Sequence, residues 1–186
     1  MNSIPVSKII WYIKTQFYRL RFGKIGKMTY IGRPTSWYGT QNIFIGSKVR
    51  IQPGCRLETH DGGQIIIEDN VSIGQNFHCT ASGKLVIHKN TTVSGNVFIT
   101  DIDHDYTQIG IHVLEQNRIN KATEIRENCF IGFGAAIQAG TRLGTQCIIG
   151  TNAVVRGDYP DFSVIVGVPG RIVKQYNSAS GKWERV

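Results

Sequence analysis

The residues best suited to chemistry gather in one polar stretch, residues 100–124, which begins TDIDHDY. It holds two of the five histidines, His104 and His112, and three acidic residues close to His104. The unperturbed pKa of histidine is about 6.5, so His104 could accept a proton from a hydroxyl group near neutral pH. The spacing alone leaves a second interpretation equally open, in which His104 is a surface histidine bonded to a neighbouring carboxylate.

A repeat of six residues, directly after this stretch, predicts the elements that must position it. Helices and flat strands have side-chain periods of about 3.6 and 2, so a period of six indicates a coil that turns a corner every six residues. This is the signature of a parallel β-helix. The aliphatic positions of the repeat are Ile125, Ile131, Ile137, Leu143, Ile149 and Val155, and the small residues four positions after the first five are Cys129, Ala135, Thr141, Cys147 and Ala153.

The same frame runs through much of the chain, with interruptions. It begins near Ile25, is clear over residues 45–57, and returns at residues 67–73 and 87–99. It is lost completely over residues 100–124, which are therefore predicted to form a long loop pushed out of the solenoid. Long loops in compact domains are usually functional or disordered, and the histidines and acids favour function here.

Residues 4–22 are predicted to form a basic amphipathic helix, because apolar residues recur on one helical face among lysines and arginines. Two compatible interpretations are open. The helix could cap the open end of the solenoid, which is favoured, or it could be a foot that contacts an anionic membrane surface. The apolar face consists of Ile9, Ile10, Ile13, Phe17 and Leu20.

These patterns divide the chain into three parts. Residues 1–24 form the helical cap, residues 25–173 form the solenoid with its loop, and residues 174–186 form a polar tail expected to fray or to make a short helix. A chain of 186 residues is long enough for one domain with a sizeable core.

The composition narrows the choice of partners and compartment. Lys and Arg outnumber Asp and Glu by 21 to 13, which fits an anionic membrane, a phosphate-bearing small molecule or nucleic acid. A nucleic-acid groove is not favoured, because the cations are scattered apart from a cluster near the start. Cysteines occur without a CxxC pair and are expected to be reduced packing residues, so a cytoplasmic location is expected, with the inner face of the membrane as an option. They are Cys55, Cys79, Cys129 and Cys147.

The Ile-Gly-x-x-Ala/Cys repeats, the histidine-bearing loop and the ending IVGVPGRIVKQY resemble the left-handed β-helix acyltransferases. Within that superfamily the chain is similar to the maltose and galactoside O-acetyltransferase branch, and above all to members that acetylate polysaccharide and lipopolysaccharide sugars. The resemblance covers about residues 25–175. It implies an all-β fold, a left-handed parallel β-helix of hexapeptide repeats, with acetyl-CoA as donor and a sugar as acceptor. It also implies a homotrimer with active sites between subunits and no required metal.

The resemblance assigns catalytic roles within the loop. His104 matches the general base, whose Nε2 would take the proton of the attacking hydroxyl as the acetyl group is transferred directly. Asp101 matches the acid often found in this loop, and Asp103 is its local rival for holding the other ring nitrogen.

The resemblance also assigns binding residues. Thr80 stands where an asparagine is expected, which leaves His78 as a possible acceptor contact, and Phe130 stands where an aromatic wall is common. Basic residues at the nucleotide end would bind the phosphates of coenzyme A. The acceptor-side residues are His78, Thr80, Asp103 and Phe130, and the donor-side residues are Phe133, Gly134, Ala135, Thr151, Asn152, Arg156, Arg171 and Lys174.

Three other functions stay open. Attack by an amine would make the protein an N-acetyltransferase acting on a nucleotide-linked amino sugar. A carbonic anhydrase of the γ type shares the solenoid but needs three well-spaced histidines around zinc, which the five histidines do not offer. A solenoid scaffold that docks on a membrane or partner would need only the repeats and the helix. His60 and His88 are expected to be solvated.

Overall fold

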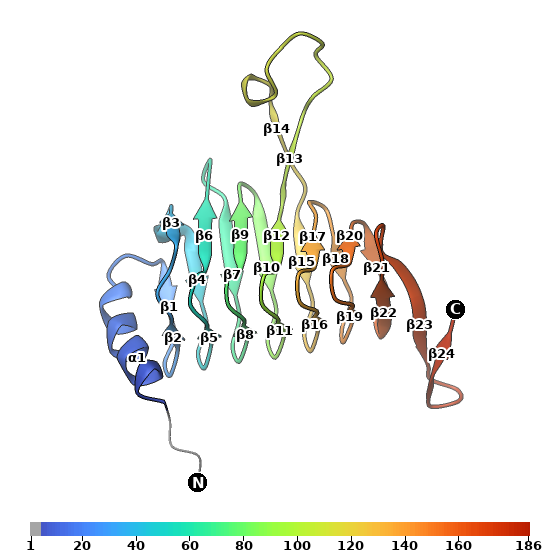
Figure 1. The fold of residues 1–186 in the computed structure, drawn as a ribbon, viewed down its shortest axis with the longest axis horizontal. Coiled ribbons are helices and arrows are strands. Elements are labelled where there is room, and N and C mark those ends of the chain that lie inside the picture. Colours follow the sequence, from blue (N-terminus) through green and yellow to red (C-terminus); the bar gives the residue numbers. More distant parts are fainter. Residues whose placement is uncertain (1–4) are drawn as a thin grey trace.

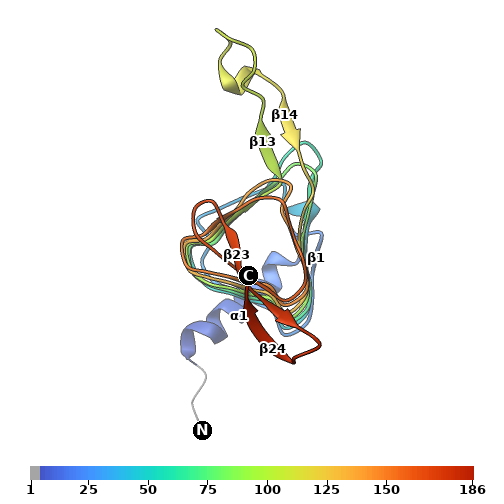
Figure 2. The same cartoon turned by 90° about the vertical axis from the view of Figure 1, so that its right-hand side faces the viewer.

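The computed structural model describes residues 5–186, which form a three-sided prism of stacked coils (Figure 1). Viewed along the axis, successive coils superimpose into one triangular outline (Figure 2). The first residues of the predicted cap, 1–4, lie outside the described residues. The predicted solenoid is confirmed, and its first strand starts at Lys24.

Each side of the prism is one sheet whose solenoid strands are parallel neighbours in successive coils. The seven-stranded sheet contains β1 (Lys24–Ile25), β4 (Ile43–Ile45), β7 (Gln64–Ile67), β10 (Lys84–Ile87), β15 (Thr123–Ile125), β18 (Arg142–Leu143) and β21 (Asp158–Tyr159). The nine-stranded sheet contains β2 (Tyr30–Ile31), β5 (Arg50–Ile51), β8 (Ser72–Ile73), β11 (Thr92–Val93), β16 (Phe130–Ile131), β19 (Ile148–Ile149), β22 (Ser163–Val166), β23 (Arg171–Asn177) and β24 (Lys182–Arg185). The six-stranded sheet contains β3 (Ser36–Tyr38), β6 (Arg56–Thr59), β9 (His78–Ala81), β12 (Phe98–Thr100), β17 (Ala136–Ile137) and β20 (Val154–Val155).

The core runs along the prism axis and is built from the predicted six-residue frame. Every aliphatic position from Ile125 to Val155 is buried, and each small residue four positions later is buried beside it. Parallel register stacks equivalent residues, so that Ile87 pairs with Ile67 on one side and with Ile125 on the other. All four cysteines are buried and free, as predicted.

The helix α1 (Val6–Tyr18) covers the open end of the first coil (Figure 1), which confirms the predicted cap. Thr15 accepts a hydrogen bond from the Ile31 N–H at 2.9 Å, and Arg19 donates one to the Gly26 carbonyl at 2.9 Å. Both partners are main-chain groups of the first coil, where the stack ends. In residues 5–186 no helix is long and apolar enough to cross a membrane.

The predicted loop is an antiparallel hairpin that rises from the prism (Figures 1 and 2). Its strands are β13 (Ile102–His104) and β14 (Arg118–Asn120), and a short 3-10 helix, Val113–Glu115, lies near its tip. A second 3-10 helix, Thr40–Asn42, turns an earlier corner.

The prediction for the C-terminal tail is wrong. Residues 174–186 neither fray nor form a helix, because β23 pairs antiparallel with β22 and β24 pairs with β23. The last coil leaves a row of main-chain groups without a following coil, and the returning chain provides hydrogen-bond partners for them.

Candidate active site

A cleft of about 520 Å³ lies on the outer face of the six-stranded sheet, beneath the hairpin. Its floor is made of side chains that point outward from β6, β9 and β12. Parallel register places these side chains in two rows that cross the strands. Residues of one row are about one coil apart in the sequence, and this spacing is the signal from which the rows could have been predicted. The rows are Arg56, His78 and Phe98, followed by Glu58, Thr80 and Thr100.

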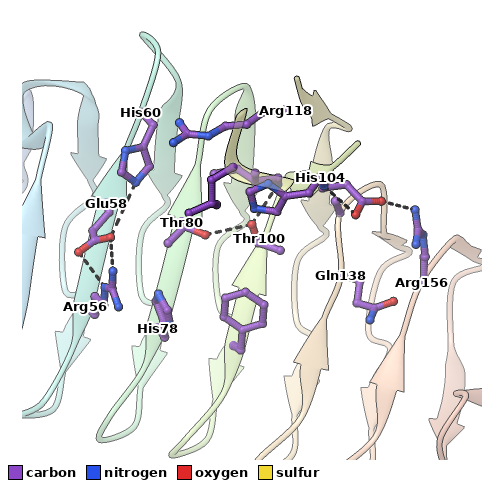
Figure 3. A pocket seen from close by; sticks show the side chains of 15 residues that line it. Arg56, Glu58, His60, His78, Thr80, Thr100, His104, Arg118, Gln138 and Arg156 are labelled. Atoms are coloured by element: carbon purple, nitrogen blue, oxygen red, sulfur yellow. Dashed lines mark hydrogen bonds and ion pairs between the residues drawn. The ribbon is translucent and has the colours of Figure 1, made fainter. Parts of the chain in front are cut away.

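His104 lies in the middle of this cleft (Figure 3). Its Nδ1 atom is buried and has no hydrogen-bond partner among residues 5–186. Asp103 accepts a hydrogen bond from the main-chain N–H of His104 at 3.0 Å and not from its ring. The structure therefore does not show a surface histidine bonded to a carboxylate. It places an imidazole in the cleft, as the general-base hypothesis requires.

The predicted partnership of Asp101 with the His104 ring is not present in the described chain. Asp101 is fully buried, and its two oxygens accept hydrogen bonds from the N–H groups of Ser82 at 2.8 Å and Gly83 at 2.9 Å. Burial raises the pKa of Asp101, and these hydrogen bonds offset part of the rise. Asp101 fastens the base of the hairpin to the preceding coil, a structural role that spacing alone could not distinguish from a catalytic one.

Asp103 lies in the cleft, as predicted, and is held by cations. Arg156 approaches its Oδ2 at 2.6 Å and Lys121 at 3.8 Å. Burial tends to raise the pKa of Asp103, but the hydrogen bonds from the His104 N–H and from Arg156 outweigh it and lower the pKa. Asp103 is thus an ionised link between the strand β13 that carries His104 and the coil that carries Arg156.

His78 and Thr80 also lie in the cleft, where the sequence placed acceptor contacts. The ring centroid of His78 is 5.0 Å from that of Phe98. Burial, and secondarily the charge of Arg56, lowers the pKa of His78, so this imidazole is neutral near pH 7. Thr80 and Thr100 share a hydrogen bond of 3.0 Å between their hydroxyl groups.

The N-terminal end of the cleft contains residues that the sequence interpretation missed. Glu58 accepts two hydrogen bonds from Arg56, at 2.7 and 2.8 Å, and these lower its pKa. His60 stacks on Tyr38 with 5.2 Å between ring centroids. His60 was expected to be solvated; its side chain lines the cleft and is 28% exposed. His88, which was also expected to be solvated, is partly exposed on another face and contacts two glutamates at 3.1 and 2.8 Å.

Of the predicted donor residues, one lines the cleft and the others lie elsewhere on the solenoid. Arg156 lines the cleft itself. Phe133 and Gly134 form a corner stacked on the corner of Thr151 and Asn152, with the Asn152 N–H bonded to the Phe133 carbonyl at 2.8 Å. Their roles stay predictions.

Ala135 cannot offer its side chain to a ligand, because it is fully buried. Its main-chain N–H and carbonyl are both used inside the solenoid, bonded to Gly132 at 3.2 Å and to Phe98 at 3.0 Å. The role of Ala135 on the donor side stays a prediction, and its side chain does not contribute to it.

Three further predicted residues lie outside the cleft of the chain that carries His104. Phe130 belongs to the nine-stranded sheet, and the phenylalanine that lines the cleft is Phe98. Arg171 and Lys174 lie on β23, at the C-terminal end of the nine-stranded sheet. Any role for these three would have to be played in another cleft, such as one shared with a second subunit. Within residues 5–186, no three His, Cys, Asp or Glu side chains are grouped to hold a metal ion.

Comparison with known proteins identifies the class. Residues 122–157 match the family described as bacterial transferase hexapeptide (six repeats). Over 151 residues the chain is 30% identical to the putative lipopolysaccharide biosynthesis O-acetyl transferase WbbJ of Escherichia coli K12, covering 77% of each protein. It is 28% identical over 165 residues to the dTDP-4-amino-4,6-dideoxy-D-glucose acyltransferase of Escherichia coli, covering 86% of this chain and 85% of the relative.

A solved structure supports the fold. AntD, an N-acyltransferase from Bacillus cereus in complex with dTDP and 3-hydroxybutyryl-CoA, superimposes with a TM-score of 0.75. The identity is 19%, and the match covers 91% of this chain and 92% of that one. The chain therefore belongs to the hexapeptide-repeat acyltransferases, the left-handed β-helix family that its sequence resembles, and within it to the acetyltransferases.

Proposed function

We propose that this protein is an acetyl-CoA-dependent O-acetyltransferase that modifies a sugar hydroxyl of a polysaccharide or lipopolysaccharide precursor. The observation that carries the proposal is the His104 imidazole in a cleft that also presents two hydroxyl groups and an amide. Thr80, Thr100 and Gln138 all line this cleft, and such groups suit the many hydroxyls of a sugar. The relationship to the putative O-acetyl transferase WbbJ supports the same acceptor class.

His104 performs the proton transfers in this mechanism. Its imidazole takes the proton of the acceptor hydroxyl while the oxygen forms its bond to the acyl carbon. The proton then passes from His104 to the departing thiolate as the carbon–sulfur bond breaks, which restores the neutral ring. Acetyl-CoA, when bound, supplies the thioester carbonyl. Asp103 holds the main chain of His104 in place, and Arg156 holds Asp103.

The pantetheine arm of acetyl-CoA is proposed to bind along exposed corner turns of the solenoid. Phe133 and Thr151 are exposed on stacked corners where a pantetheine arm could lie along the solenoid. Arg171 and Lys174 are proposed to meet the phosphates of coenzyme A across a subunit boundary, since they lie away from the cleft of their own chain. A homotrimer, as in the resemblance above, would bring these surfaces together.

The pairing of the cleft arginines with carboxylates favours an acceptor that does not place a nucleoside diphosphate in this cleft. A nucleotide-linked sugar would require cations free to bind its phosphates. Three arginines line the cleft of the described chain, and each already contacts a carboxylate. The pairs are Arg56 with Glu58, Arg118 with Asp61, and Arg156 with Asp103.

The second candidate is N-acylation of a nucleotide-linked amino sugar. It is favoured by the 28% identity to the dTDP-4-amino-4,6-dideoxy-D-glucose acyltransferase, which covers most of both chains. The two candidates differ in acceptor chemistry and share His104 as base.

An acceptor panel tests the proposal. The purified protein is mixed with acetyl-CoA and with free sugars, lipid-linked sugars, polysaccharide, or a dTDP-linked amino sugar, and released thiol is measured. All four cysteines of the protein are buried, so the background from the native enzyme is low. We expect release with a hydroxyl acceptor of the lipid-linked or polymeric class. Release only with the amino sugar would replace the proposal by the second candidate, and binding of coenzyme A without transfer to any acceptor would contradict both.

A further inference from the structure

The two sides of α1 differ in what they contact. The inner face carries Lys8, Trp11, Thr15 and Tyr18, spaced so that they share one side of a helix. Thr15 is fully buried and bonded to the first coil, and Trp11 and Tyr18 pack near Tyr30 and Trp37. The contacts of the inner face are therefore sufficient for the helix to cap the solenoid, and the opposite face is not needed for this role.

The outer face, on the opposite side, is apolar and exposed. We define it as Val6, Ile9, Ile10, Ile13 and Phe17 of the helix together with Leu20 just after it. Ile13 is 54% exposed, Phe17 68% and Leu20 87%. In the described part of the chain none of these side chains belongs to the core, and contiguous exposed apolar groups usually mark a surface that binds something.

The charge around the outer face has one sign. The first acidic residue of the sequence is Glu58, and the 57 residues before it contain ten lysines and arginines. Lys14 and Arg21 are exposed beside the outer face, and Lys24 and Lys27 are exposed on the first coil. The rest of the chain has 11 basic and 13 acidic residues, so the positive charge of the protein comes from this end.

We propose that this end of the solenoid docks on an anionic lipid bilayer, with the outer face of α1 in the interface and the basic residues against the headgroups. Apolar residues on one face and cations around it are the combination that holds a helix in the plane of a membrane surface. A second copy is disfavoured as occupant, because two such surfaces facing each other would bring like charges together. Nucleic acid would attract the cations but leave the apolar side chains in water.

The proposal does not depend on the acetyl transfer proposed above. In a cyclic trimer with parallel solenoids, three copies of α1 would lie at the same end and would bind one membrane together, which strengthens attachment. The helix is short, so this multiplicity matters for its affinity.

Vesicle sedimentation tests the docking. The full-length protein is mixed with vesicles of pure phosphatidylcholine or of phosphatidylcholine with phosphatidylglycerol. One variant removes apolar groups (Ile13→Ser with Phe17→Ser), and a second reverses charges at the helix (Lys14→Glu with Arg21→Glu). The matched control makes the same charge change at the opposite end of the solenoid (Lys182→Glu with Arg185→Glu), where both residues are exposed. Circular dichroism and light scattering establish fold and oligomeric state for each variant.

We expect the wild-type protein and the control to bind the anionic vesicles about tenfold or more tightly than the neutral ones. Each helix variant should lose about tenfold or more of that affinity with its fold and oligomeric state unchanged. Equal binding to both kinds of vesicle, no binding at all, or an equal loss in the control overturns the proposal. It also falls if the Ile13 and Phe17 change alters the mass in solution, because the outer face would then be an interface between copies.

Discussion

Replacing Asp101 separates the structural role seen here from the catalytic role suggested by sequence. Asp101→Ala leaves the N–H groups of Ser82 and Gly83 without their acceptor in a buried place. Each unpaired N–H costs about 1–3 kcal/mol, so the free energy of unfolding should fall by about 2–6 kcal/mol. Asp101→Asn keeps one acceptor oxygen but turns a donor toward the other N–H, and should cost about half as much.

The assay is urea unfolding followed by circular dichroism, with released thiol measured on the same samples. Asp105→Asn is the control, since Asp105 belongs to the same hairpin and its side chain bonds to the nearby Thr107. We expect Asp101→Ala to be less stable than Asp101→Asn, Asp105→Asn to match the wild type, and activity to follow the folded fraction. If Asp101→Asn keeps wild-type stability and loses transfer, Asp101 acts on the His104 ring and the structural assignment is refuted.

Three further predictions concern the cleft and its supports. The lowered pKa of His78 means that protonation favours the unfolded chain, so the contribution of His78 to stability should be full above about pH 6.5 and be lost as the pH drops through the folded-state pKa. Urea unfolding at about pH 5 and pH 7.5 should therefore show a smaller loss of stability at low pH for His78→Gln than for the wild type. Gly134→Ala should cost about 0.5–1.5 kcal/mol more than Gly62→Ala in the same unfolding assay, because both glycines have positive φ (+70° and +80°) but only a Cβ at Gly134 would force the side chain of Asn152 to turn aside. Arg156→Ala breaks a half-exposed ion pair with Asp103 and should change the free energy of unfolding by less than about 1 kcal/mol. The rate of thiol release should nevertheless fall about fivefold or more, because Asp103 no longer steadies the strand that carries His104. A loss of activity no larger than the loss of folded protein would contradict this prediction.

The solenoid was readable from the sequence because each coil repeats one simple requirement. An aliphatic residue such as Ile131 must point inward on each side, and a small one such as Cys129 must fit near each corner. The loss of that frame also located the hairpin. These features depend on local spacing, which a single sequence records directly.

The contacts at the two open ends of the stack were predicted only in part, since the cap was expected but neither the face of the helix that makes it nor the strands at the other end were. The end of the first coil binds the side of α1 that carries Thr15 and two aromatic rings, and the aliphatic side faces outward. The last coil recruits β23 and β24 from a tail that looked unstructured. In both cases the deciding factor is the hydrogen bonding of an open sheet end, which has no side-chain signature.

The candidate site was predicted in part. His104, His78 and Thr80 meet in one cleft as the resemblance implied. The sequence could not show which way Asp101 turns, because an aspartate three residues from a histidine can face either the ring or the main chain below it. Phe98 was missed because its partnership with His78 depends on register between coils and not on neighbouring sequence.

The most direct test of the central claim is the rate of thiol release by His104→Ala with an acceptor that the wild-type protein acetylates. His88→Ala is the matched control, because His88 lies on another face between two glutamates. We expect His104→Ala to lose a factor of about 10² to 10⁴ in rate while coenzyme A binding by calorimetry stays unchanged, and His88→Ala to keep its rate. Undiminished transfer by His104→Ala would contradict the assignment of this imidazole as the base.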